Sequence, residues 1–238
     1  MPSAPPLLSP EFERLLDRLA ADIIDAAVFR KLRVDLNALF EDYWLEFNQS
    51  QTFWSLSFKA YAELVLYRLG RVYVSQKGAL SLAAWMEAIR TNPQLFVTAP
   101  DPVQLGTDIE SVGNKDPLVK KLICLRGNFV AHVNWDHTAS GGVKIREDAF
   151  ALDWAEIDLL ISRATDILNR YSILFKQTSW ITDIAGRDDH KYILKAVRSD
   201  LERMKAEIAF RDIRDRTGER TWLNYREAPS TQQPTAAE

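Results

Sequence analysis

One stretch of the chain, LVKKLICLRGNFVAHV at residues 118–133, combines side chains that can move protons and hold phosphate. Arg126 and His132 are separated by five residues, and the polar Asn128 lies between them. An imidazole gains or loses a proton near neutral pH. A guanidinium binds phosphate oxygens through paired N–H donors. The spacing therefore presents a proton-transfer group and an anion-binding group within two turns of one predicted helix.

A helix must position these residues. Asp116-Pro117 is typical of a helix start, with an acidic cap followed by proline, and we expect this helix to end near Asn134. Lys121, Asn128 and His132 should lie together beside its apolar stripe, with Arg126 about 120° away from His132 around the axis. The expected stripe comprises Leu118, Leu122, Leu125, Phe129 and Val133.

Gly127 and the local charge add two features to this helix. A glycine inside a helix costs about 1 kcal/mol relative to alanine, and Gly127 with Ala131 leaves a shallow groove where a second backbone could approach, as across a two-fold axis.

Residues 115–146 hold six lysines or arginines and two aspartates, a net charge of +4 in a chain of net charge −3. This local excess predicts a phosphate-bearing ligand.

The stretch resembles a known family. Arg126-Gly-Asn-Phe-Val-Ala-His132 resembles the Arg-x(4–6)-His motif of the HEPN superfamily, and LRGNFVAHVNWD is similar to the matching stretch of abortive-infection HEPN proteins of the AbiU type. The segments Phe53-Trp54-Ser55-Leu56 and Leu80 to Phe96 have a similar look. The chain departs from the pattern beside Arg126, where Gly127 precedes the polar Asn128. A downstream acidic residue, if needed, is Asp136.

The resemblance implies an all-α, HEPN-like helical bundle that forms a homodimer and cleaves RNA without a metal or cofactor. His132 would take the proton of a ribose 2′-OH, and Arg126 would stabilise the phosphate. Asn128 would orient His132 or bind the phosphate. Lys121 and Trp135 are the expected substrate-binding residues, Trp135 by stacking on a base. The expected product is a 2′,3′-cyclic phosphate, and the implied role is phage defence or toxin activity with a possible antitoxin partner.

Simpler interpretations exist for the same residues. His132 could be a helical histidine bonded to a neighbour, and Arg126 could pair with Glu63 on a facing helix, or Glu63 could face solvent. Cys124 is expected to be a packed thiol. His137 and His190 lack metal-site spacing, so we expect both at the surface. Two other functions stay open: a non-catalytic HEPN protein that binds nucleotide or RNA, and a helical protein-interaction module.

The remaining apolar periodicity predicts further helices. Ser9 and Pro10 open a helical pattern that runs to Tyr43, as one helix or two with a break near Lys31. Further helices are expected at about 52–74, 82–91, 153–178 and 189–216, the last with a charged, solvated face, and a loop at 98–115. We expect an N-terminal helical region at 1–50, a bundle core at 51–180, a charged C-terminal helix within 181–227 and a disordered tail at 228–238.

Composition narrows the class of protein. The negative net charge argues against a general polyelectrolyte binder, so contact with RNA must come from a local patch. Cys124 is the only cysteine, which excludes an intramolecular disulfide and a zinc site built on thiolates. The N-terminus lacks the basic and apolar runs of a signal peptide, and no uncharged stretch approaches the roughly 18 residues that span a bilayer. We therefore expect a cytoplasmic protein with no membrane partner.

Overall fold

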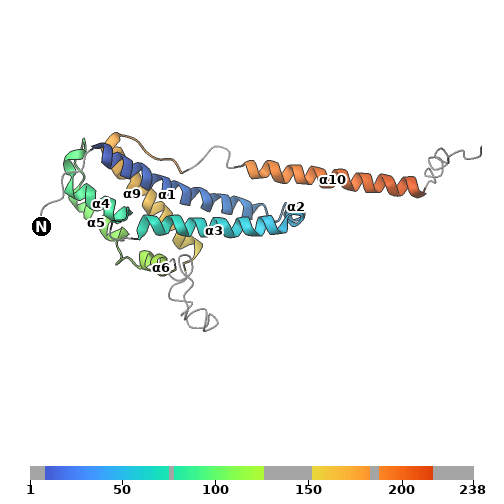
Figure 1. Cartoon of the computed structure of the whole chain (residues 1–238), viewed down its shortest axis with the longest axis horizontal. Helices are drawn as coiled ribbons and strands as arrows, with labels where there is room; N and C mark the ends of the chain where they lie inside the picture. The colour runs from blue at the N-terminus through green and yellow to red at the C-terminus, as the bar shows by residue number, and fades with distance from the viewer. Residues whose placement is uncertain (1–8, 75–77, 126–151, 183–187, 217–238) are drawn as a thin grey trace, which may run out of the picture. The chain divides into compact units, whose positions relative to one another are not determined.

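The computed structural model describes residues 9–74, 78–125, 152–182 and 188–216 (Figure 1). Within these ranges all regular structure is helical, and no strand occurs. The all-α prediction is therefore confirmed. No helix in the same ranges has both the length and the apolar character needed to cross a membrane.

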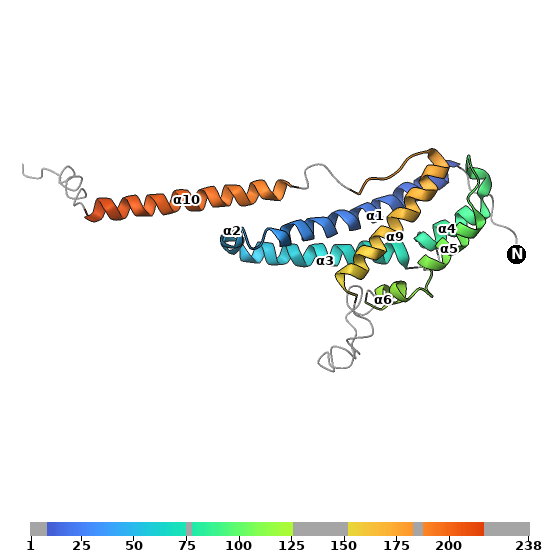
Figure 2. The ribbon, with the colours of Figure 1, turned by 180° about the vertical axis from the view of Figure 1, so that it is seen from behind.

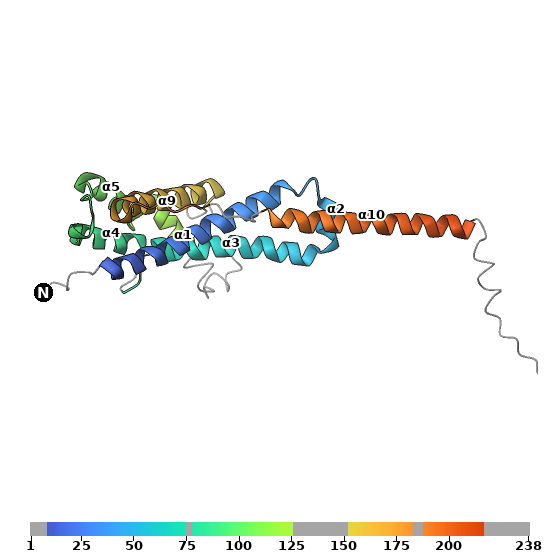
Figure 3. The same ribbon diagram turned by 90° about the horizontal axis from the view of Figure 1, so that it is seen from above.

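The described chain forms two compact units, the first within residues 1–42 and 50–187. In this unit α1 packs along α3, α9 packs against α1, and α4 contacts α5 (Figures 2 and 3). Its elements are α1 (Ser9–Ala38), α3 (Gln51–Tyr73), α4 (Leu82–Thr91), the 3-10 turn η1 (Pro93–Leu95), α5 (Pro102–Val112), α6 (Pro117–Leu125) and α9 (Trp154–Lys176).

Aromatic rings fill the centre of the first unit. Phe12 of α1 stacks on Trp85 with ring centroids 5.7 Å apart, and it meets Phe175 edge-on at 4.8 Å. Trp85 in turn meets Tyr171 edge-on at 6.1 Å. The Tyr73 hydroxyl donates to the Leu160 carbonyl at 2.7 Å, which satisfies both buried groups. Helices α1, α3, α4 and α9 therefore share one core, which holds the frame for the candidate site.

The second unit comprises residues 43–49 and 188–238, and its described helices are α2 (Trp44–Gln49) and α10 (Asp189–Arg216). The Arg198 Nε atom donates to the buried Glu46 carboxylate at 2.6 Å. This hydrogen bond lowers the pKa of Glu46 below its usual value, against the opposing effect of burial. The Arg198 guanidinium also lies 4.0 Å from the centre of the Tyr43 ring. One arginine thus joins α10 to the short α2 segment.

Several predicted boundaries agree with the structure and two do not. The helices at 82–91 and 189–216 match α4 and α10, and the helices near 52–74 and 153–178 match α3 and α9 within two residues. The loop predicted for 98–115 is wrong, because residues 102–112 form α5. Asp101 caps α5 by accepting from the Val103 N–H at 3.0 Å, and Pro102 occupies the first turn.

The start of the chain also differs in detail. Helix α1 has no break near Lys31, and it ends at Ala38 rather than Tyr43. Residues 39–43 are turn, and the sequence analysis missed the six-residue α2. The apolar spacing through Phe40 and Tyr43 indicated a continuing helix, although Phe40 is 48% exposed.

His190 is a further correction. The sequence placed it at the surface, but its side chain is buried. It precedes the fully buried Leu194 by four residues on α10, so both lie on one helical face. The expectation that α10 presents a charged, solvated face is met beyond Glu202, where all described side chains are exposed.

The buried ring stack should dominate the stability of the first unit. We expect Trp85→Ala to lower the free energy of unfolding by about 3–5 kcal/mol, because it removes a fully buried ring and leaves a cavity between α1 and α9. Urea unfolding followed by circular dichroism measures this loss. Trp44→Ala is the control: that ring is 55% exposed, and its loss should cost about 0.5 kcal/mol or less. Equal losses in the two variants would contradict the proposed core.

Candidate functional site

Helix α6 leads directly into the candidate motif and is fixed firmly at its start. Asp116 Oδ1 accepts from the backbone N–H groups of Leu118 and Val119 at 2.9 and 3.0 Å, the predicted cap. Arg163 of α9 contacts the other Asp116 oxygen at 3.1 Å and donates to the Ser111 carbonyl at 2.6 Å. One guanidinium therefore ties the end of α5 and the start of α6 to α9.

The buried face of α6 is rotated from the predicted stripe. Val119 and Leu122 are fully buried, while Leu118 and Ile123 pack against the core only in part. Leu125 is half-buried and lies outside the core cluster. The buried face is therefore centred between Val119 and Leu122, where α6 packs against α3 and α9.

Lys121 joins the later turns of α6 to the first turn of α9. Its ammonium pairs with Glu156 Oε1, and the two side chains are 30% and 23% exposed. Glu156 Oε2 accepts from the Asp153 N–H at 3.2 Å, and the Glu156 N–H donates to Asp153 Oδ1 at 2.7 Å, forming a capping box. A single carboxylate therefore links α6 to the cap of α9, and Figure 2 shows α6 beside the yellow first turns of α9.

This pair holds the two ends of the motif-bearing segment close to each other. Residues 126–151 leave α6 after Leu125 and return at Leu152, which packs in part against the core. Arg126, Asn128, His132 and Trp135 lie outside the described residues. The catalytic roles given to them, and the stacking role of Trp135, stay predictions.

Lys121 is the one predicted site residue that the structure describes. Its pairing with Glu156 uses one of the three donors of the ammonium group. Its role in substrate binding stays a prediction beside this structural role. Glu63, the alternative partner for Arg126, faces solvent: its side chain is 60% exposed and its ammonium partner is Lys59, at 3.8 Å.

Two arginines of α1 meet the first residue of α9. The guanidinium carbons of Arg30 and Arg33 lie 4.7 and 4.5 Å from the centre of the Trp154 ring. Arg30 also makes a bidentate pair with Asp158, with N–O distances of 2.6 and 2.7 Å. Burial and the neighbouring charge of Arg30 lower the pKa of Arg33. The sequence analysis missed this cluster; the signal was the three-residue spacing of Arg30 and Arg33, which places both on one helical face.

A second ionic cluster, between α5 and α9, is structural. The buried Asp108 accepts from Gln104 at 2.9 Å and from the Tyr171 hydroxyl at 2.8 Å, and it pairs with Arg170. Burial and the hydrogen bond to Asp108 raise the pKa of Tyr171, so its hydroxyl keeps its proton at neutral pH. Because its carboxylate is fully engaged and its tyrosine does not titrate, this cluster has no group available for catalysis.

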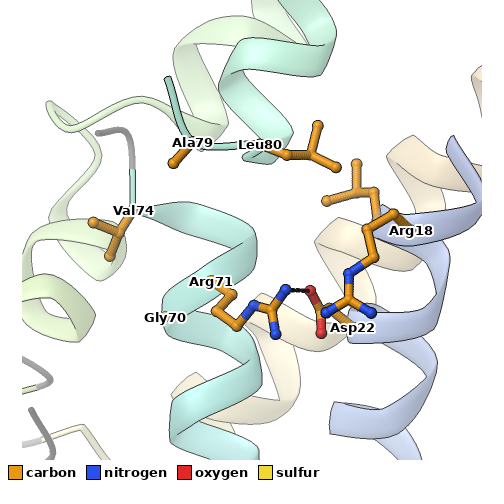
Figure 4. Close-up of a pocket in the computed structure, with 8 residues that line it drawn as sticks. Arg18, Asp22, Gly70, Arg71, Val74, Ala79 and Leu80 are labelled. Carbon is orange, nitrogen blue, oxygen red and sulfur yellow. Dashed lines mark ion pairs between the residues drawn. The ribbon is translucent and has the colours of Figure 1, made fainter. Parts of the chain in front are cut away.

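A small pocket lies where α1 and α3 approach residues 78–80 (Figure 4). Its volume of about 170 Å³ is below the range typical of ligand sites, roughly 300–1,000 Å³. Asp22 pairs there with Arg71 at 3.2 Å and with Arg68 at 2.7 Å, and Arg68 also reaches Asp25 at 2.9 Å. The carboxylate that lines the pocket, Asp22, is thus taken up by ion pairs that join α1 to α3. We regard the pocket as part of that helix contact.

A wider groove of about 440 Å³ runs between α1 and α9. Arg30 and Lys31 line it together with Asp35 and Asp158, so its charges balance. We therefore do not expect this groove to favour an anionic ligand. The guanidinium of Arg33 beside Trp154 differs in this respect. In the part of the chain that the structure describes, no group of three or more His, Cys, Asp or Glu side chains is arranged to hold a metal ion.

The all-α core, together with the Arg-x(5)-His spacing in the sequence, agrees with the HEPN class. The chain belongs to the AbiU2 family of HEPN proteins, whose family model matches residues 9–196. The match spans the whole frame described here, α1 through α9, and ends within α10. No curated protein and no solved structure matches the chain.

The Lys121–Glu156 pair should be measurable as a coupling between α6 and α9. We expect a double-mutant cycle of Lys121→Ala and Glu156→Gln to give a coupling of about 0.5–1 kcal/mol, since both groups are partly exposed. Glutamine keeps an acceptor for the Asp153 N–H, so the capping box is perturbed less than the charge. Urea unfolding of the four proteins provides the values, and raising the salt concentration should reduce the coupling. A coupling of zero at low salt would show that the pair does not hold α6.

Proposed function

We propose that the chain is a metal-independent endoribonuclease of the HEPN type, with Arg126, Asn128 and His132 as catalytic residues. The observation that carries this proposal is membership of the AbiU2 family together with the Arg-x(5)-His spacing in this sequence. The described frame supports it, because α6 and the cap of α9 anchor both ends of the motif-bearing segment.

The proposed reaction is an internal transesterification. His132 accepts the proton of a ribose 2′-OH, whose oxygen attacks the adjacent phosphorus. The P–O2′ bond forms, the P–O5′ bond breaks, and the leaving 5′-oxygen takes up a proton. Arg126 offsets the charge that builds on the phosphate, and Asn128 orients the imidazole or binds a phosphate oxygen. The products are a 2′,3′-cyclic phosphate and a 5′-hydroxyl.

Two further parts of the proposal concern substrate contact and assembly. Lys121 and Trp135 would bind the RNA strand, Lys121 with the donors that Glu156 does not use. On one regular helix Arg126 and His132 point about 120° apart, so we place Arg126 of one protomer beside His132 of its partner in a homodimer. The biological role would be phage defence or toxin activity in the cytoplasm, held in check by an antitoxin protein.

A second candidate function, a helical protein-interaction module, is favoured by one observation. The later half of α10 exposes large apolar side chains, each at least 43% accessible: Met204, Ile208, Phe210 and Ile213. Such residues on a helix suit contact with another protein. A protein-binding role for α10 is compatible with the nuclease function, because an antitoxin would need a binding surface on the nuclease.

Cleavage of a single-stranded RNA tests the nuclease proposal. We expect His132→Ala and Arg126→Ala each to slow cleavage by about 100-fold or more, because each removes a group acting on the transition state. His137→Ala is the matched control and should cleave like the wild type. Gel electrophoresis with identification of the 2′,3′-cyclic end measures the outcome. Cleavage by His132→Ala at the wild-type rate would refute the assignment.

Mixing two inactive variants tests the composite dimer. Co-expressed Arg126→Ala and His132→Ala chains should recover roughly a quarter of the wild-type activity, because half of the dimers are mixed and each mixed dimer has one intact site. Activity of the co-purified mixture is compared with each variant alone. No recovery in a verified mixed dimer would place each site within a single protomer.

A further inference from the structure

Arg33 differs from the other partly buried arginines of the described chain. Each of the others contacts a carboxylate: Arg30, Arg68, Arg71, Arg163, Arg170 and Arg198. Arg33 has no such contact within residues 9–74, 78–125, 152–182 and 188–216, and its Nε atom is enclosed without a hydrogen-bond partner. A half-buried charge without a counter-charge is costly, and such groups are usually paired.

Aromatic rings hold Arg33 in this position. Its guanidinium lies over Trp154 of α9 at 4.5 Å and near Phe58 of α3 at 5.9 Å. Contact with a ring face stabilises the cation and restricts its orientation, but leaves its charge in place. Asp158 on α9 is engaged by Arg30 through two hydrogen bonds. Among the described residues, the structure therefore presents an oriented guanidinium that no carboxylate pairs.

The position of Arg33 relates it to the motif-bearing segment. Trp154 is the first residue of α9, and Asp153 and Glu156 in the same turn form the cap that pairs with Lys121 of α6. Residues 126–151 return to the described frame at Leu152, two residues before Trp154. Arg30 and Arg33 both lie against the Trp154 ring, so a base is not expected to stack on it. Contact of a phosphate with Arg33 is the more suitable interaction.

We propose that Arg33 binds a phosphate of the RNA strand on which Arg126 and His132 act, with Trp154 fixing the direction of its guanidinium. This inference rests on the proposed nuclease function. A planar guanidinium suits the bidentate recognition of phosphate oxygens. The bound anion would supply the counter-charge that the described chain does not.

Binding of a single-stranded RNA oligonucleotide to the His132→Ala protein, followed by fluorescence anisotropy, tests the proposal without cleavage of the probe. In this protein, Arg33→Gln should weaken RNA binding by about ten-fold, the effect of losing a charged hydrogen bond. The slope of log affinity against log salt should become shallower by about 0.7, as expected for one phosphate contact. Arg14→Gln is the matched control: it removes the same charge from an exposed site on α1 and should change neither quantity.

Thermal unfolding of each variant separates RNA binding from a structural role. A lower melting temperature for Arg33→Gln with unchanged RNA affinity would show that Arg33 serves only to pack α1 against Trp154 and Phe58, and would overturn the proposal. If Arg33→Gln does not fold, Arg33→Lys decides: weaker RNA binding at an unchanged melting temperature supports the proposal, and unchanged binding refutes it. Absence of both RNA binding and cleavage in the wild-type protein would instead reject the nuclease function itself.

Discussion

The carboxylate of Glu156 is the contact on which the candidate site depends. One of its oxygens pairs with Lys121 of α6, and the other accepts the N–H of Asp153 at the cap of α9. Arg163 reinforces the connection by holding Asp116 at the start of α6. The described ends on either side of the motif-bearing residues, α6 and the start of α9, are therefore joined to each other.

The distribution of charge on the frame separates structural ion pairs from a candidate ligand contact. Asp22 with Arg68 and Arg71, and Asp108 with Arg170, join helices and leave no spare charge on the carboxylate. Arg33 is held instead by aromatic rings beside the start of α9. A protein with net charge −3 that binds RNA must concentrate positive charge locally. Beside α6 and Trp154, Arg30 and Lys121 are paired with Asp158 and Glu156, which leaves the charge of Arg33 for such a contact.

Much of the helical frame could be predicted from local signals. Asp116 with Pro117 and Asp153 with Glu156 marked two helix starts, because capping is decided by residues within one turn. Asp101 with Pro102 is also a helix start, before α5. The glycine, proline and asparagine residues around it favoured a loop, and the loop was predicted instead. The rotation of α6 could not be predicted, since it depends on packing against α3 and α9, which are distant in sequence.

The candidate site was predictable only in part, for a related reason. Spacing within one helix indicated Arg126, Asn128 and His132, but the pairing of Lys121 with Glu156 joins residues 35 positions apart. The approach of Arg33 to Trp154 spans α1 and α9, so periodicity could show only that Arg30 and Arg33 share a face. His190 was misplaced because a lone polar residue at a helix start gives no sign of burial.

Replacement of a single 2′-hydroxyl tests the central claim most directly. In single-turnover reactions with two RNA strands that differ only by a 2′-deoxy sugar on the 5′ side of the cleaved bond, the wild-type protein should cut the all-ribose strand and leave that bond intact in the other. Both strands should bind with the same affinity, because the phosphates are unchanged. Cleavage of the deoxy-substituted bond at an equal rate would contradict attack by the 2′-oxygen, and with it the role given to His132.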